Sequence, residues 1–185
     1  SESGVVREAK ILNRIIQATD KGWEYECDQR HAEIMIEAMG MQNSKPLGTP
    51  ASDDSHKKDD EEEAADRELL NAEDTALFRG LVARANYMSQ DRSELQYPVK
   101  ELCRSMSAPD VGAWARLKRL VRYLVGRPRA VMRFEWQPVA KELDVYSDAN
   151  WAGCKVSRKS TSGGTVMWGK VCLKSYSKAQ ATIAQ

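Results

Sequence analysis

The residues best suited to chemistry in this chain are two aspartates in a strand-like run near its C-terminal end. From Leu143 to Asp148 the side chains alternate in character, and a period of two places Asp144 and Asp148 on one face of the strand. Carboxylate oxygens are preferred ligands of Mg²⁺, and a bound divalent ion can activate water against a phosphodiester. The run therefore predicts an acidic strand face with the chemistry of a metal-binding site.

Two further strands must support this face. Gly164 to Trp168 and Val171 to Ser177 are strand-like runs separated only by Gly169 and Lys170, a spacing typical of an antiparallel hairpin. We predict that these runs and Leu143 to Asp148 form one antiparallel sheet. A strand ending in Asp and followed by a meander is also how ribonuclease H folds begin. Exposed strand edges and apolar surface are expected to make the isolated protein prone to associate.

The sequence motifs in this stretch are specific to one protein family. YSDANWAG, RKSTSGG and SYSKAQ closely resemble the start of the ribonuclease H domain in copia-type retrotransposon polyproteins. In that family the first metal-binding Asp lies in the SDxxWAG motif, which implies that Asp148 is a catalytic residue and a metal ligand, with Asp144 as a second, weaker candidate. The family continues past the KxQ segment into a helix that supplies the catalytic Glu, whereas this chain ends at Gln185. We therefore expect Mg²⁺ in the complete family enzyme, no tight binding of it here, and no activity of this chain alone.

Two other blocks carry the same resemblance. WEYECDQRHAEIMIEAMGMQNSKPLGTP resembles the segment after the polymerase palm in copia-type reverse transcriptases, and FRGLVARANYMSQDRSELQYPVKELCRSMSAPD with WARLKRLVRYLVG resembles the block that connects polymerase to ribonuclease H. The resemblance implies a parent RNA-directed DNA polymerase that also hydrolyses RNA in RNA–DNA hybrids. Gln90 to Ser93 departs from the Thr-Arg-Pro-Asp-like string that the family usually has there.

The N-terminal residues predict a small helix, strand, helix unit. Apolar residues at 5, 9, 12, 15 and 16 indicate a helix over 5–18, and Trp23 to Cys27 indicates a strand. Asp28 can cap a helix from Gln29 to Met39, which Gly40 is placed to end.

Three helices are predicted further along, over 76–88, 95–106 and 112–125. The last carries basic residues on its exposed flanks and just beyond its end, in an arrangement suited to phosphate contacts. These candidate nucleic-acid-binding residues are Arg116, Lys118, Arg119, Arg122, Arg127 and Arg129. An ordinary solvated basic face is the equally open alternative. From Arg129 to Trp136, alternation of apolar and charged residues predicts a half-buried strand at the edge of the C-terminal sheet or outside it.

Charge divides the chain into an acidic and a basic half. Residues 1–75 hold 9 Lys and Arg against 19 Asp and Glu, and residues 76–185 hold 19 against 8. A basic half attracts phosphate backbones, so nucleic acid, either an RNA–DNA hybrid or DNA, is the expected partner. Residues 51–74 combine dense charge with low hydrophobicity and predict an acidic flexible linker.

Composition excludes several classes of protein. No run approaches the about 20 apolar residues of a membrane span, and the first residues lack a signal-peptide pattern, so we expect an intracellular protein, cytoplasmic or nuclear, with no membrane partner. The four cysteines and two histidines are scattered, and their spacing predicts no zinc or redox site.

The predicted fold class is α+β: a mostly helical N-terminal and central part, followed by a short antiparallel sheet that is an incomplete ribonuclease H-like fold. We predict a reverse transcriptase tail over 1–50, the linker over 51–75, a helical connection region over 76–128 and the start of a ribonuclease H-like domain over 129–185. The leading hypothesis is a nucleic-acid-associated fragment of a copia-type polyprotein that is completed by other parts of that polyprotein. The alternatives are a noncatalytic nucleic-acid-binding or assembly module and a decayed retroelement relic.

Overall fold

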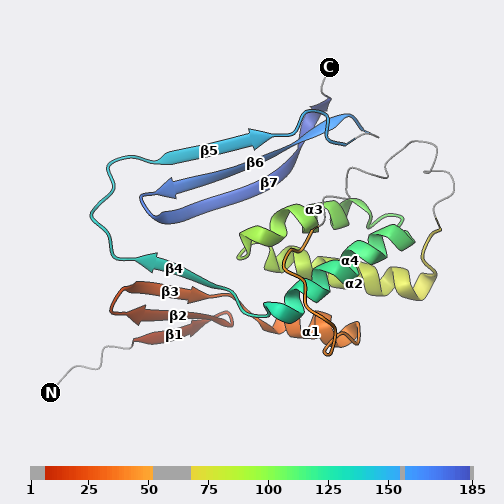
Figure 1. Cartoon of the computed structure of the whole chain (residues 1–185), viewed down its shortest axis with the longest axis horizontal. Coiled ribbons are helices and arrows are strands. Elements are labelled where there is room, and N and C mark those ends of the chain that lie inside the picture. The colour runs from red at the N-terminus through yellow and green to blue at the C-terminus, as the bar shows by residue number, and fades with distance from the viewer. Residues whose placement is uncertain (1–6, 52–67, 155–156, 184–185) are drawn as a thin grey trace.

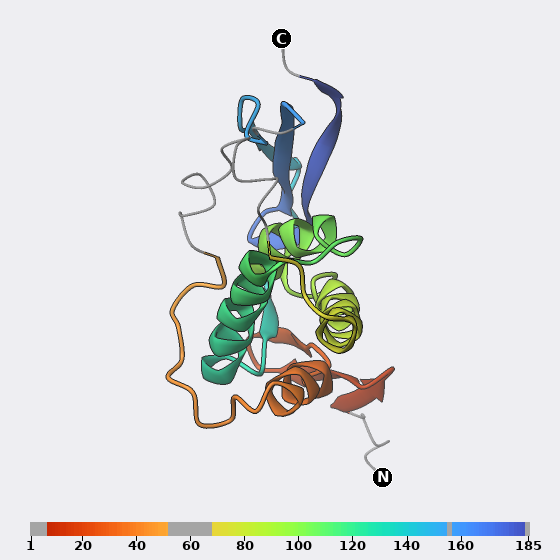
Figure 2. The same ribbon diagram turned by 90° about the vertical axis from the view of Figure 1, so that its right-hand side faces the viewer.

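A computed structural model describes residues 7–51, 68–154 and 157–183 of the chain. Two antiparallel sheets and a group of helices make up the described structure, and the helices lie beside the N-terminal sheet and beneath the C-terminal one (Figures 1 and 2). The α+β class is therefore confirmed. Within the described residues, none of the helices combines the length and the apolar character that a bilayer crossing requires.

The N-terminal part begins with strands, so the predicted helix over 5–18 and the mostly helical N-terminal part are wrong. Strands β1 (Glu8–Ile11), β2 (Arg14–Thr19) and β3 (Gly22–Glu26) form an antiparallel meander. Leu12 and Asn13 adopt φ of 50° and 61°, and two successive positive φ values make the two-residue turn that joins twisted strands. This turn places Leu12 in solvent and breaks the apolar stripe from which the helix was predicted. The strand predicted over 23–27 is confirmed.

The fourth strand of this sheet comes from far along the chain. Strand β4 (Val131–Glu135) pairs antiparallel with β3, with Gly22 opposite Glu135. Gly22 has φ of 148° and its Cα lies against the Phe134 carbonyl, so a side chain there would collide with β4. The strand over 129–136 was predicted at the edge of the C-terminal sheet or outside it, and it lies outside. It pairs with the N-terminal residues, although it was grouped with residues 129–185.

The helix group contains the hydrophobic core. Helices α1 (Arg30–Ala38), α2 (Ala72–Met88), α3 (Gln96–Arg104) and α4 (Val111–Gly126) pack together, with the short 3-10 helix η3 (Ser93–Leu95) before α3. The largest fully buried side chains all lie in this group: Phe78, Met35, Leu95, Leu102, Leu117, Leu120, Leu124, Val82, Val99 and Val121. The four predicted helical segments here are confirmed as elements.

The helix ends follow from local chemistry. The Asn71 and Asp110 side chains accept hydrogen bonds from the Asp74 and Ala113 N–H groups, at 2.8 and 2.6 Å, and so begin α2 and α4. Asn71 thus starts α2 at Ala72, four residues earlier than predicted. Gly40, with φ of 60°, ends α1 as predicted. Residues 52–67, which hold most of the predicted acidic linker, lie outside the described residues, and the division into four parts stays a prediction.

The C-terminal sheet has the predicted strands and order. Strands β5 (Asp144–Ala149), β6 (Lys159–Trp168) and β7 (Val171–Ile183) pair antiparallel in the order β5-β6-β7. Gly169, with φ of 57°, makes the tight turn between β6 and β7. The segment between β4 and β5 is tied to this turn, because the Gln137 side chain donates to the Trp168 carbonyl at 3.0 Å and accepts from the Lys170 N–H at 2.8 Å.

Candidate functional site

The two candidate carboxylates lie on one face of β5, as the period of two predicts. Asp148 is in register with Gly163 of β6, and Asp144 with Met167. Both aspartates are exposed, and the Ala149 N–H donates to Asp148 Oδ1 at 2.8 Å. Since Gly163 has no side chain, nothing on the neighbouring strand covers Asp148 from the position opposite. The carboxylate is thus presented to solvent near the end of its strand.

The carboxylates do not by themselves fit a metal centre. Among the described residues, no three His, Cys, Asp or Glu side chains come together in an arrangement that could hold a metal ion. Mg²⁺ takes near-octahedral oxygen coordination and is held weakly by one or two carboxylates without further ligands. The described residues therefore supply two exposed carboxylates on one strand rather than a complete metal site.

The turn after β5 is held by polar side chains that were not among the predicted site residues. Asn150 Oδ1 accepts from the Thr161 N–H at 2.6 Å, and Ser160 Oγ accepts from the Ala152 N–H at 3.0 Å. A side chain at Gly153 would collide with the Asn150 amide. These contacts fix the backbone that follows Asp148 and leave Trp151 75% exposed. The Asn and Gly between two strand-like runs were the available signal for such a turn.

Four of the predicted basic residues lie on helix α4, but two of them form hydrogen bonds with another segment of the chain. Arg122 donates to the Lys45 carbonyl at 3.0 Å, and Arg119 donates to Thr49 Oγ1 at 2.9 Å. The segment 45–50 thereby lies along α4, and a side chain at Gly126 would meet Pro46. Arg119 and Arg122 are accordingly half-buried and help to hold that segment.

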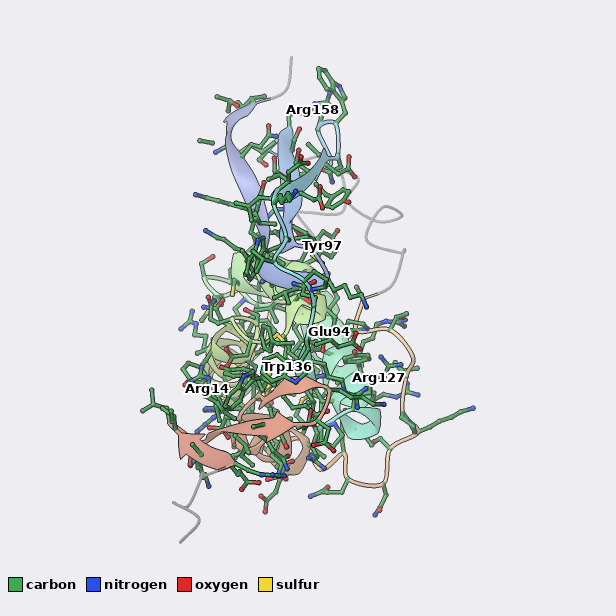
Figure 3. All side chains as sticks on the ribbon, turned by 90° about the vertical axis from the view of Figure 1, so that its left-hand side faces the viewer. Arg14, Glu94, Tyr97, Arg127, Trp136 and Arg158 are labelled. Carbon is green, nitrogen blue, oxygen red and sulfur yellow. The ribbon has the colours of Figure 1, made fainter. Side chains whose placement is uncertain are left out.

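The other basic candidates differ in how they are held. Arg116 and Lys118 are exposed; Arg116 donates to Ser105 Oγ at 3.3 Å, and the Lys118 ammonium lies 5.9 Å from the centre of the Trp114 ring. Arg127 follows the end of α4 (Figure 3), and its guanidinium lies 5.6 Å from the centre of the Tyr123 ring. Arg129 makes two hydrogen bonds to the Glu26 carboxylate, at 2.7 and 2.6 Å. Among the members that lie within α4 itself, Arg116 and Lys118 are therefore the ones best presented to a ligand.

Helix α3 joins the C-terminal sheet to the helices through polar contacts. Gln96 donates to the Ser175 carbonyl at 3.2 Å, and the Lys100 ammonium donates to Thr161 Oγ1 at 2.6 Å. Arg104 contacts Cys154 Sγ at 2.6 Å. Burial opposes ionisation of this thiol, but hydrogen bonds from Ser157 and Arg104 outweigh it, and the pKa of Cys154 is lowered. The sheet that carries Asp148 is thus positioned by three side chains of α3.

Asp91 joins the N-terminal sheet to the helices. It accepts from Arg14 Nε at 2.8 Å and from the Tyr25 hydroxyl at 3.0 Å, and its backbone carbonyl accepts from the Cys27 thiol. Burial, together with the hydrogen bond to Asp91, raises the pKa of Tyr25 to about 12. In the sequence, Gln90 to Ser93 is distinguished only by its departure from the family string, and no local pattern marks Asp91 as a partner of strands that lie over 60 residues away.

The Glu26–Arg129 pair predicts a pH dependence of stability. The Arg129 guanidinium holds the pKa of Glu26 below its ordinary value of 4.5. The unfolded state therefore binds more protons than the native state in this range, so the stabilisation is present above pH 4.5 and is lost as the pH falls through the native pKa. Urea unfolding on both sides of this pH should show that the free energy of unfolding decreases as the pH falls. The decrease should be smaller in the Glu26→Gln variant. Equal pH slopes in the two proteins would contradict the assignment.

Comparison with known proteins identifies relatives for most of the chain. It is 27% identical over 158 residues to an uncharacterized mitochondrial protein of Arabidopsis thaliana, an alignment that covers 84% of this chain and 61% of the relative. It is 34% identical over 112 residues to the retrovirus-related Pol polyprotein from transposon RE2 of the same plant, covering 60% of this chain and 8% of that polyprotein. A secreted RxLR effector protein of Plasmopara viticola is 39% identical over 93 residues, covering 50% of this chain and 65% of the effector.

The chain thus spans about three fifths of one of these relatives and under a tenth of the Pol polyprotein. No protein-family model matches the chain, and no solved structure matches it.

Proposed function

We infer that this chain, which is similar to part of the Pol polyproteins from transposons RE1 and RE2, acts as a nucleic-acid-associated segment of a copia-type retrotransposon Pol polyprotein that leads into a ribonuclease H-like unit. The observation that carries this proposal is the strand order β5-β6-β7 with Asp148 near the end of the first strand, in the sequence motif that resembles the family's metal-binding one. The expected partners are an RNA–DNA hybrid or DNA and the other parts of the polyprotein, in the cytoplasm or nucleus.

In this proposal Asp148 is a ligand of Mg²⁺, and Asp144 has a lesser role on the same strand face. Bound Mg²⁺ would supply an activated water and charge neutralisation at a phosphodiester. Because the described carboxylates do not make a complete site, hydrolysis requires residues from elsewhere in a Pol-length polypeptide. The function proposed for this chain by itself is binding, with Asp148 presented for assembly into that site.

The exposed basic residues of α4 provide a direct test of binding. Replacing Arg116 and Lys118 with glutamine should weaken affinity for an RNA–DNA hybrid to a similar extent for all sequences, and should reduce the slope of log affinity against log salt by about two, because phosphate contacts are lost. Fluorescence anisotropy over a salt series measures both quantities.

A matched variant controls for charge. Lys10→Gln with Lys21→Gln makes the same charge change on the exposed surface of the N-terminal sheet and should leave affinity nearly unchanged. Unaltered binding in the Arg116 and Lys118 variant would mean that this helix face is merely solvated. Arg119 and Arg122 are left in place because they hold segment 45–50. If they were replaced, a loss of affinity could come from a change in structure rather than from lost phosphate contacts.

A noncatalytic nucleic-acid-binding or assembly module is the second candidate. Two observations favour it. Several basic residues are exposed, and among the described residues no three metal-binding side chains come together. A Pol-length polypeptide that binds hybrid tightly but never cleaves it would support this candidate over the first.

A further inference from the structure

The two faces of the C-terminal sheet differ in charge. In β7 the residues Lys174, Tyr176 and Lys178 share one face, and their register partners in β6 are Val166, Gly164 and Ser162. The corresponding residues of β5 on that face are Val145, Ser147 and Ala149. Asp144 and Asp148 lie on the opposite face. The face that holds Lys174, Tyr176 and Lys178, here called the lysine–tyrosine face, therefore carries no strand carboxylate.

This face is open to solvent. Lys174 and Lys178 are exposed, and among the described residues the lysines that form ion pairs are Lys100 and Lys170 instead. Helix α3 approaches from the other side, because Lys100 bonds to the side chain of Thr161, which shares its face with Asp148. No helix of the described chain therefore neutralises or covers the two lysines.

Tyr176 is held flat on this face by a glycine. A Cβ built on Gly164 would lie 2.6 Å from the Tyr176 ring, so the ring lies across the bare backbone of β6. Aromatic residues commonly cover a cross-strand glycine in this way. The side chain remains 40% exposed. One side of the ring is thus packed on the sheet, and the other is presented to solvent between two lysines.

An exposed aromatic ring flanked by cations on a flat sheet is suited to a nucleotide with an unpaired base. Bases stack on aromatic side chains without regard to sequence, and lysines beside them neutralise the phosphates. Residues two apart in an antiparallel strand lie about 7 Å from each other, so the two ammonium groups can reach phosphates on either side of a stacked base. Paired bases in a duplex cannot present a face to the ring in this way.

We propose that the lysine–tyrosine face binds single-stranded nucleic acid, with a base stacked on Tyr176 and phosphates at Lys174 and Lys178. This goes beyond the proposed function, because it assigns a second site, on a different element from α4, and a distinct ligand class. The sheet would then hold an unpaired strand on one face and present Asp148 on the other.

The test uses the full chain and short labelled oligothymidylate and oligouridylate in anisotropy titrations. Tyr176→Leu keeps an apolar side chain over Gly164 but removes the stacking surface, and should weaken affinity by about 5- to 150-fold. Tyr176→Phe keeps the ring and should bind like the natural chain. If both variants melt at the natural temperature and bind equally well, the stacking assignment is overturned.

The lysines are tested separately. Lys174→Gln with Lys178→Gln should lower the salt slope by about 1.4, as expected for two contacts to single-stranded phosphates. The Lys10 and Lys21 variant should retain the natural slope. Equal slopes in all three proteins would overturn the role of the lysines.

Two comparisons separate this inference from the proposed function. Single strands should compete for this face better than a duplex of the same length, and equal competition would overturn the ligand class. If the Tyr176 and lysine variants bind normally while the Arg116 and Lys118 variant does not, this inference fails and the proposed function stands. The reverse result supports the lysine–tyrosine face and removes α4 from the interface. No binding of any nucleic acid by the natural chain overturns both.

Discussion

Replacing Asp148 with asparagine is expected to abolish hydrolysis of the RNA strand by a Pol-length polypeptide that contains this chain, while binding of the RNA–DNA hybrid is largely retained. Asparagine keeps the size of the side chain but removes the negative charge that a divalent ion requires. The exposed position of Asp148 on β5 means that the sheet should fold normally in the variant. Release of labelled fragments from a hybrid, with and without Mg²⁺, measures the effect.

Asp144→Asn is the matched control, because Asp144 lies on the same face of the same strand and is also exposed. It should reduce hydrolysis much less than Asp148→Asn. An active Asp148→Asn enzyme would show that the wrong carboxylate was assigned. An inactive Asp144→Asn enzyme that still folds would show the same.

Replacing Asp91 with alanine is expected to lower the free energy of unfolding by about 2–4 kcal/mol, since it leaves a mostly buried Arg14 without its carboxylate partner and removes the acceptor of the Tyr25 hydroxyl. Tyr25→Phe removes only one hydrogen bond and should cost about 1 kcal/mol. Urea unfolding followed by circular dichroism measures both changes.

Glu142→Ala is the control for this prediction, because Glu142 is an exposed carboxylate between β4 and β5 and should change stability by no more than about 0.5 kcal/mol. If Asp91→Ala unfolds like the natural protein, Asp91 does not join the N-terminal sheet to the helices. Loss of only the N-terminal sheet in the Asp91 variant, with the helices intact, would instead show that the two parts unfold separately.

Local patterns were enough to predict the helices and the C-terminal sheet. The apolar stripes of α2, α3 and α4 repeat over two or more turns, and a glycine turn separates β6 from β7. The N-terminal hairpin was missed because its apolar residues fall by chance at helical spacing. Leu12 and Asn13, which make the turn, are not the Asn-Gly pair that usually marks one.

The candidate site could be predicted only where strand periodicity determines it. A period of two places Asp144 and Asp148 together whatever surrounds them. By contrast, the bond of Arg119 to Thr49 joins residues 70 apart in the sequence, and no local signal distinguishes it from an exposed arginine. The pairing of β3 with β4 and the contacts of Asp91 are missed for the same reason, since long-range contacts depend on how whole elements pack.

The most direct test of the proposed nucleic-acid binding is the affinity of the natural 185-residue chain for an RNA–DNA hybrid as a function of salt concentration. A nucleic-acid-associated Pol segment should bind the hybrid, and the logarithm of its affinity should fall linearly with the logarithm of salt concentration as counterions are released. Absence of binding at low salt, or an affinity that does not respond to salt, would contradict the account.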